Sequence, residues 1–244
     1  MSTLRITRAG IVGSLVVLVV AATCVRLGIW QLHRLDERRG RNARIAARMA
    51  APALALERSS GDTAGLAFRR VTARGTWDDE RTIVWAGRSL QGDPGVYVLT
   101  PLLLPGGGAV VVNRGWLPSP DAATVDLASY KVLGSVQLAG LLVPYPPPDE
   151  TADTMRRRVR YHVDQAGVAA SLPYPVEPVL LQLTPTADAR QLPRPLPPPA
   201  LDEGPHLSYA IQWFSFAVIG IVGWVVLLLR SPRADTERVP TQPG

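Results

Sequence analysis

The chain has 244 residues, 26 basic and 20 acidic side chains, and a formal net charge of +6. Its single cysteine, Cys24, excludes an intrachain disulfide and a metal site built on a pair of cysteines. The basic residues are spread along the chain rather than gathered on one face, so we expect no nucleic-acid partner.

The first predicted element is an apolar run of residues 9–29, preceded by a short tail of residues 1–8. A cleaved signal peptide would also combine a basic start, an apolar middle and small residues near its end. This run is longer than a usual signal core, and Arg26 near its end can reach the membrane surface. We therefore predict a retained transmembrane helix that holds Cys24 as a small apolar filler.

A polar region of residues 30–206 follows, and its hydrophobic pattern predicts mostly β-structure. Trp30 suits a membrane interface, and the stretch after Gly40 is expected to begin as helix and to continue as loop. Short runs of alternating or continuous apolar residues then recur between turn residues. The predicted strands are residues 68–77, 82–86, 95–104, 109–117, 136–143, 160–163 and 179–183.

These strands predict a mostly antiparallel barrel or sandwich. Residues 82–86 are expected to form a hairpin with residues 68–77, whose small and apolar residues share one face. Residues 95–104 and 109–117 are expected to pair across a Pro-Gly-Gly-Gly turn. Asp164 is placed to cap a short helix. The proline-rich residues 193–199 are expected to be an extended linker that returns to the membrane.

The second apolar run, residues 207–229, contains no charged side chain and exceeds the thickness of a bilayer core, about 30 Å, as a helix. The fold class expected is thus a membrane α+β protein, with two terminal transmembrane helices flanking an extramembrane β domain. Arginines in the tail of residues 230–244 favour a cytoplasmic C-terminus. More arginines follow the first run than precede it, so charge alone gives conflicting orientations.

His206 opens the second apolar run and is the first candidate site residue. Helical spacing places Tyr209, Trp213, Phe216 and Gly220 below it on one side. Imidazole is a normal ligand of haem iron, and aromatic side chains form the flat apolar wall that a porphyrin needs.

Two other interpretations of this stripe stay open. His206 can simply mark the water boundary, or the stripe can pack against another membrane helix. In that case Ala210, Ala217, Gly220 and Gly223 would allow close approach, and Gln212 would be a hydrogen-bonding group within the membrane. His33 follows the first span and is a candidate second histidine at the same membrane surface.

A polar group ends the valine-rich strand of residues 109–117: Asn113, Arg114, Gly115 and Trp116. Gly115 permits a positive φ or a β-bulge there. Arg114 is a candidate clamp for a carboxylate or a propionate, and the group is otherwise expected to brace the fold or to contact a partner.

The chain contains no glycine-rich phosphate loop, no zinc-protease motif and no nucleophile elbow, so we do not expect an enzyme. Five segments, in order, resemble the Surfeit-locus-one (Surf-one) family of cytochrome c oxidase assembly proteins. They are Gly28–Arg34 (GIWQLHR), Phe68–Trp77 (FRRVTARGTW), Gly95–Leu102 (GVYVLTPL), Val112–Pro118 (VNRGWLP) and His206–Trp213 (HLSYAIQW). The stretch from about residue 122 to residue 199 resembles the family only weakly.

The resemblance implies two membrane helices in a bacterial plasma membrane, an outward-facing central domain and both tails inside. It implies help in maturing an aa3-type haem-copper oxidase, with the oxidase catalytic subunit as partner and haem a synthase as a further one. His206 matches the histidine usually suspected of ligating the iron of haem a. Gly28, Trp30, Gln31 and Arg34 match the motif at the end of the first span. The alternative is a chaperone of an oxidase subunit that binds no haem.

Overall fold

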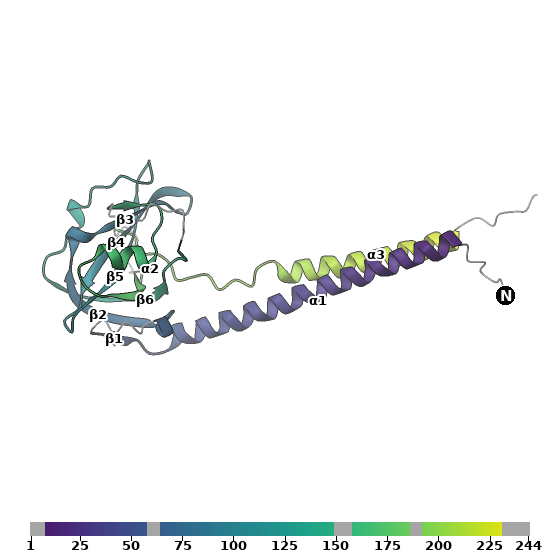
Figure 1. The fold of residues 1–244 in the computed structure, drawn as a ribbon, viewed down its shortest axis with the longest axis horizontal. Helices are drawn as coiled ribbons and strands as arrows, with labels where there is room; N and C mark the ends of the chain where they lie inside the picture. The colour runs from purple at the N-terminus through teal and green to yellow at the C-terminus, as the bar shows by residue number, and fades with distance from the viewer. Residues whose placement is uncertain (1–7, 58–63, 149–157, 186–191, 231–244) are drawn as a thin grey trace, which may run out of the picture. The chain divides into compact units, whose positions relative to one another are not determined.

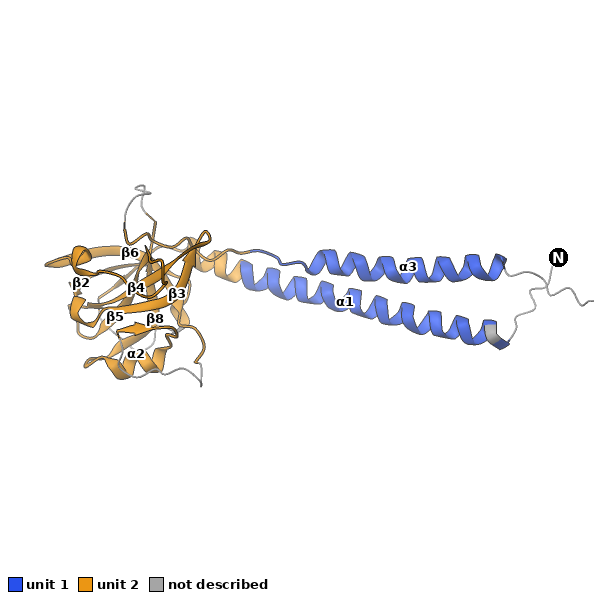
Figure 2. Cartoon of the chain, turned by 90° about the horizontal axis from the view of Figure 1, so that it is seen from above, with its two compact units in different colours: residues 1–42, 202–244 blue, residues 43–201 orange. Residues whose placement is uncertain are grey.

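The computed structural model describes residues 8–57, 64–148, 158–185 and 192–230. Arg5 before the first apolar run, and Arg233 and Arg238 in the tail after the second, bear on the predicted orientation and lie outside the described residues. The chain divides into two compact units, residues 1–42 with 202–244 and residues 43–201 (Figure 2). Each unit is considered by itself below.

The first unit consists of two long helices, α1 (Arg8–Ala50) and α3 (His206–Arg230). The end of α1, from Ala43 onward, belongs to the second unit. Both are long and apolar enough to cross a membrane. Most apolar side chains of α3, among them Ile211, Ile219 and Leu229, are exposed. The core helix of a soluble protein would bury such side chains, so the two helices indicate membrane association.

The two helices run antiparallel and pack along one regular seam (Figure 1). On α1 the buried or half-buried positions recur at alternating steps of three and four residues. They are Ser14, Val17, Ala21, Cys24, Gly28, Gln31, Leu35 and Arg38. The matching positions of α3 are His206, Ala210, Trp213, Ala217 and Trp224. Steps of three and four keep a helical seam facing one partner, as in coiled coils.

The second unit is built on one sheet, which has eight strands across the described residues. The strands are β1 (Leu54–Leu56), β2 (Arg70–Trp77), β3 (Ile83–Leu90), β4 (Asp93–Leu103), β5 (Ala109–Pro118), β6 (Ser135–Pro144), β7 (Val159–Arg160) and β8 (Val176–Leu183). The helix α2 (Gln165–Ser171) and the 3₁₀ turns η1 (Ala64–Leu66), η2 (Asp79–Arg81) and η3 (Ala128–Tyr130) complete it.

The sheet closes into a barrel. β2 pairs with β6, β6 with β8, β8 with β5, and β5 with β4, whose end returns to β2. That closure is made by Thr76 opposite Leu103 and Trp77 opposite Leu102. Most of these pairings are antiparallel, and β5 with β8 is the parallel pair of the ring. The expected α+β class with two terminal apolar helices and a mostly antiparallel β domain is confirmed.

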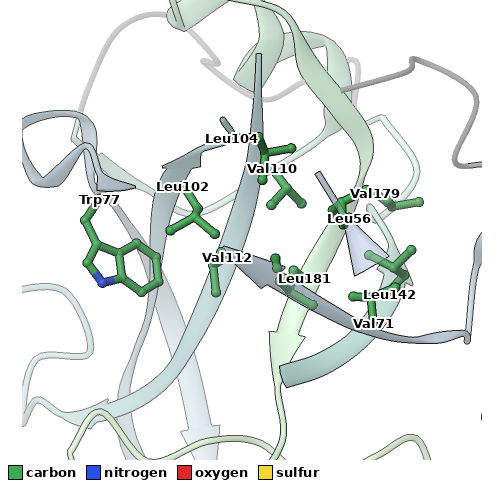
Figure 3. Packing of buried hydrophobic residues seen from close by; sticks show 11 residues of the cluster. Leu56, Val71, Trp77, Leu102, Leu104, Val110, Val112, Leu142, Val179 and Leu181 are labelled. Carbon is green, nitrogen blue, oxygen red and sulfur yellow. The ribbon is translucent and has the colours of Figure 1, made fainter. Parts of the chain in front are cut away.

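The barrel interior is filled by aliphatic side chains from all five strands of the ring. Figure 3 shows Leu102 of β4, Val112 of β5 and Leu181 of β8 converging on one another, and Leu142 of β6 joins them. All four are completely buried. Full burial of one such side chain contributes about 1.5–3 kcal/mol, so this cluster is a main source of the stability of the unit.

The alternation predicted for β2 is confirmed, because Val71, Ala73, Gly75 and Trp77 are all buried. The cap of α2 is confirmed too, since the Asp164 carboxylate accepts a hydrogen bond from the Gly167 amide at 2.7 Å. The predicted hairpin between β2 and β3 is wrong. β3 pairs with β4 and β7, and β2 pairs with β1, β6 and the end of β4.

The chain on either side of the barrel also differs from expectation. α1 continues without a break to Ala50, and the short strand β1 follows where loop was predicted. The proline-rich segment is extended, as predicted, yet it lies along the barrel. Arg194 forms a β-bridge with Trp116, and the Gln182 side chain donates hydrogen bonds to the carbonyls of Leu196 and Pro197.

Candidate functional site

His206 is the first residue of α3 and is half-buried against α1. Its Nδ1 lies 2.9 Å from Oε1 of Gln31, and the pair joins residues 175 positions apart. Pro205 precedes it, and the Pro205 carbonyl accepts hydrogen bonds from the Tyr209 amide and the Ser208 hydroxyl, which begin the helix. The imidazole is therefore fixed at the start of a helix and oriented by a neighbouring helix.

The segment that leads into His206 is tied to α1 by three side chains. Arg38 donates to the Asp202 carbonyl at 2.9 Å and to its carboxylate at 2.8 Å, and Asn42 donates to the same carbonyl. Arg39 makes two parallel hydrogen bonds of 2.8 Å with Glu203. The Arg39 hydrogen bond lowers the pKa of the Glu203 carboxyl. Each exposed pair adds little stability alone, but together they fix where the chain enters α3.

The predicted aromatic stripe divides between two faces of α3. Trp213 is half-buried and packs against Ala21, Cys24 and Ala217. Tyr209 and Phe216 are 45% and 55% exposed, although the Phe216 ring meets the Trp213 ring edge-on at 5.9 Å between centroids. His206 and Trp213 thus belong to the seam, whereas Tyr209 and Phe216 present their rings outside it.

Small residues of α1 receive large rings of α3. A methyl group added at Gly28 would lie about 2.6 Å from the Phe214 ring, and one at Gly13 would overlap the Trp224 ring. The Trp224 indole also donates a hydrogen bond of 2.9 Å to Ser14. Sequence reasoning missed both rings. Steps of three and four along α3 would have indicated Trp224, whereas Phe214 lies beside the seam position Trp213 and needed the structure.

Part of the proposed close-approach face does not contact α1. Ala210 and Ala217 are buried in the seam, but added methyl groups at Gly220 and Gly223 would meet nothing within 4 Å. Gln212 is exposed on α3. These residues leave a second face of α3 without a helix against it among the described residues.

The structure does not bring His33 to His206. His33 is two residues beyond Gln31, which turns it by roughly 200° around α1 and away from the seam. It is exposed, as are Trp30 and Arg34, and Arg34 is paired with Glu37 at 2.8 Å. The two histidines therefore do not share a site in this arrangement, and Gln31 stands where a second histidine was considered.

In the barrel unit, Asn113, Arg114 and Gly115 form a β-bulge. Val98 of β4 pairs with Gly115 and Leu99 with Asn113, which leaves Arg114 as the extra residue. Gly115 has φ of +126°. Its backbone amide donates a hydrogen bond of 3.0 Å to the side-chain carbonyl of Asn113. The predicted bulge and positive φ are both confirmed.

The bulge turns Arg114 into the protein, where it is only 8% exposed. Its guanidinium pairs with Asp79 at 3.3 Å, donates to the Tyr130 carbonyl at 2.5 Å and lies 4.9 Å from the centre of the Trp77 ring. Burial lowers the pKa of Arg114, and the charge of Asp79 opposes that change. These contacts are those of a brace that links the barrel to its loops.

Arg114 also lines a cavity of about 430 Å³ between the barrel and the loop of residues 123–131. The only lysine of the sequence, Lys131, and the exposed Arg158 lie at the same cavity. Asp121 organises the start of the loop through hydrogen bonds with Ser119, Ala123 and Thr124, which lower the pKa of its carboxyl. The cavity is thus lined by apolar side chains together with these three cations and the carboxylates of Asp79 and Asp126.

Among the described residues, no group of three or more His, Cys, Asp or Glu side chains is placed to hold a metal ion. A metal bound at His206 would need its other ligands from a macrocycle or from a partner. The ring nitrogen Nε2 of His206 makes no hydrogen bond with any described residue, and the exposed ring of Tyr209 follows one turn away. An imidazole nitrogen beside an aromatic ring is a donor that could hold a haem through its iron.

A family model described as the SURF1 family matches residues 18–218. The chain belongs to the SURF1 family. The match includes α1 from Leu18, the whole barrel unit and the first half of α3, and so contains both Gln31 and His206. The family is known generally as one of cytochrome c oxidase assembly factors.

Individual relatives agree with the family model. The chain is 28% identical to a SURF1-like protein of Monosiga brevicollis over 243 residues, which cover 88% of this chain and 87% of that protein. It is 27% identical to an uncharacterized SURF1-like protein of Mycobacterium tuberculosis, over 81% of this chain and 74% of the relative. Surfeit locus protein 1 of Rattus norvegicus is 29% identical over 51% of this chain and 46% of its own length.

Proposed function

We propose that this SURF1 family member is an assembly factor for an aa3-type haem-copper cytochrome c oxidase and that it holds haem a, or the unfinished haem site, at a membrane surface. The observation that carries the proposal is the family match over residues 18–218. The geometry of His206 supports the finer part, because a half-buried imidazole with one nitrogen engaged lies at the start of an apolar helix.

In this proposal the residues around the start of α3 have distinct roles. Haem a, when bound, supplies the iron to which an imidazole nitrogen can coordinate. Nε2 of His206 would hold the iron, and the exposed ring of Tyr209, one turn along α3, would offer an apolar wall, while Trp213 packs against α1 and supports that turn of the helix. Arg38, Asn42 and Asp202 hold the entry of α3 in place. No catalytic step is assigned to the chain.

The proposed setting is a bacterial plasma membrane. Helices α1 and α3 are the anchors in the lipid bilayer, and the barrel unit is on the extracytoplasmic side. The partners proposed are the catalytic subunit of the oxidase and, as the source of the cofactor, haem a synthase. Support comes from the two exposed apolar helices and from family membership.

The test is a visible spectrum of the protein purified from cells that make haem a. We expect a haem band in the wild-type protein, its loss or marked weakening in His206→Ala, and an unchanged band in His33→Ala. His33→Ala is the control, because His33 is an exposed histidine of the neighbouring helix α1. A haem band that His206→Ala leaves unchanged would remove the ligand role of His206.

A second candidate function is a chaperone that binds an oxidase subunit without haem. The observation that favours it is the second face of α3, where exposed Gln212 lies with Phe216 and Gly223. A polar amide and a glycine on a membrane helix suit close contact with another helix. Wild-type protein that carries the oxidase subunit but no haem band would favour this function over haem binding.

A further inference from the structure

The hydrogen bond between Gln31 and His206 has a consequence for the protons of the imidazole ring. We propose that Gln31 is a positioning residue that holds His206 in the tautomer with the proton on Nδ1, which leaves the lone pair of Nε2 available to a metal. This inference rests on the proposed function for its purpose, but the tautomer itself is a property of the protein without ligand.

The direction of the hydrogen bond follows from the atoms that meet. Gln31 presents Oε1 to Nδ1 at 2.9 Å, and an amide oxygen accepts but never donates. Nδ1 must therefore carry the proton. A neutral imidazole has one N–H and one lone pair, so the lone pair lies on Nε2. Nε2 has no hydrogen-bond partner among the described residues.

Gln31 is held where it is by the seam. It lies one turn from Gly28, which packs under the Phe214 ring, and one turn from Leu35, which is 3% exposed. An apolar neighbour on either side gives the amide no competing polar partner along the seam, and the hydrogen bond itself is partly buried. A hydrogen bond in such surroundings is stronger than the same bond in water.

His206 is held from the other direction. Asp202 is tied to Arg38 and Asn42, and Gly204 turns the chain with φ of +68° two residues before α3 begins at His206. The backbone at His206 is thus fixed independently of its ring. Gln31 then decides which nitrogen faces α1, as carboxylates and carbonyls do for histidines that ligate metals.

The test uses protein labelled with ¹⁵N in the histidine rings, without haem, at a pH well above the ordinary imidazole pKa of about 6.5. The nitrogen chemical shift separates N–H from lone-pair nitrogen. Because the chain has three histidines, His33→Ala and His162→Ala variants assign the signals. We expect His206 to show the proton on Nδ1 in the wild-type protein; a proton on Nε2 would overturn the inference.

Two substitutions test the role of Gln31. Gln31→Met removes the acceptor at similar size, and we expect the Nε2–H tautomer of His206 to become a major species. Gln31→Glu keeps an acceptor oxygen, and we expect the Nδ1–H form to persist. Gln137→Met, the same change at an exposed position of β6, should leave the His206 signals as in wild type. An unchanged tautomer in Gln31→Met contradicts the inference.

A second readout is the ratio of haem to protein after purification from cells that make haem a. Loss of an oriented partner of a metal ligand typically lowers affinity 10- to 100-fold. We expect Gln31→Met to retain haem at least tenfold less well than Gln31→Glu or Gln137→Met. Equal retention in all three contradicts the positioning role. Wild-type protein with the Nδ1–H form but no haem would overturn the proposed function and leave the tautomer assignment standing.

Discussion

At the scale of single residues, Gly115 shows how one position organises a polar group inside a hydrophobic barrel. Its φ of +126° is a conformation that side chains with a Cβ rarely adopt. An added methyl group would overlap the carbonyl of Arg194, which forms the β-bridge to Trp116. The bulge that Gly115 makes possible turns Arg114 toward Asp79 and Tyr130.

We predict that Gly115→Ala destabilises the barrel unit by roughly 3 kcal/mol, from backbone strain together with overlap in a packed site. Gly107→Ala is the control. Gly107 has φ of +99° but meets nothing within 4 Å, so strain alone, about 1 kcal/mol, is expected there. Thermal unfolding of the full-length protein, followed by tryptophan fluorescence, measures both. Equal losses in the two variants would show that the Arg194 contact is unimportant.

For single residues, the sequence predicts features that depend on the local chain but not those that depend on distant contacts. A glycine after a valine-rich strand predicts a bulge because the local chain carries the whole signal, and Gly115 was found in this way. The partner of His206 depends on a contact across 175 residues, which no local pattern encodes. Gln31 could be singled out as part of a motif, but its role needed the structure.

At the scale of elements, the contact between α1 and α3 depends on alternating small and large residues. Gly13 and Gly28 of α1 lie under Trp224 and Phe214 of α3, and Trp213 packs on Ala21. Close packing of this kind is the main attraction between helices in lipid, where burial of apolar surface gives no drive. The packing of the two helices therefore depends on the aromatic residues of α3 and the small residues of α1 together.

We predict that Gly28→Ala weakens the packing of α1 on α3 by about 1–3 kcal/mol, because the added methyl group must displace the Phe214 ring. Gly223→Ala introduces the same methyl group where nothing lies within 4 Å, and we expect it to be tolerated. Limited proteolysis and thermal stability in detergent compare the two variants. A Gly223→Ala protein as unstable as Gly28→Ala would show that overlap with the Phe214 ring is not the cause, because alanine favours a helix more than glycine does at both positions.

The strands illustrate what periodicity can and cannot predict. β2, β4, β5, β6 and β8 were recognisable because each is long enough to show alternation or a continuous apolar run. β3 was predicted as residues 82–86 and continues to Leu90, and the strand predicted at residues 160–163 overlaps β7 only at Arg160. β1 has three residues, too few for a pattern, and was not predicted. The wrong pairing of β2 with β3 came from assuming that neighbours in sequence form a hairpin, whereas η2 between them redirects the chain.

At the scale of the whole molecule, the order of segments is helix, barrel, helix. If both apolar helices cross the membrane, both ends of the chain lie on one side of it and the barrel on the other. The arginines gave conflicting orientations, since long translocated domains obey the charge rule weakly. Orientation is therefore a property that the sequence leaves open and that an experiment decides.

We predict that the barrel faces outward. Leu133 is 96% exposed, and the native Cys24 is buried in the helix seam. In intact cells a membrane-impermeant maleimide should label Leu133→Cys and should leave the wild-type protein unlabelled. Labelling of Leu133→Cys that appears only after the cells are made permeable would place the barrel inside and contradict the proposed orientation.

The position of β8 sets a condition on how the chain is made. β8 lies between β6 and β5 in the ring, yet it is the last strand to be synthesised. Until residues 176–183 have left the ribosome, β5 and β6 each keep an open edge, and exposed edges invite pairing with other chains. Only 22 residues separate the end of β8 from the start of α3. The barrel therefore closes at almost the same moment at which the second helix emerges, so closing the fold and anchoring its end are late and nearly simultaneous steps of biogenesis.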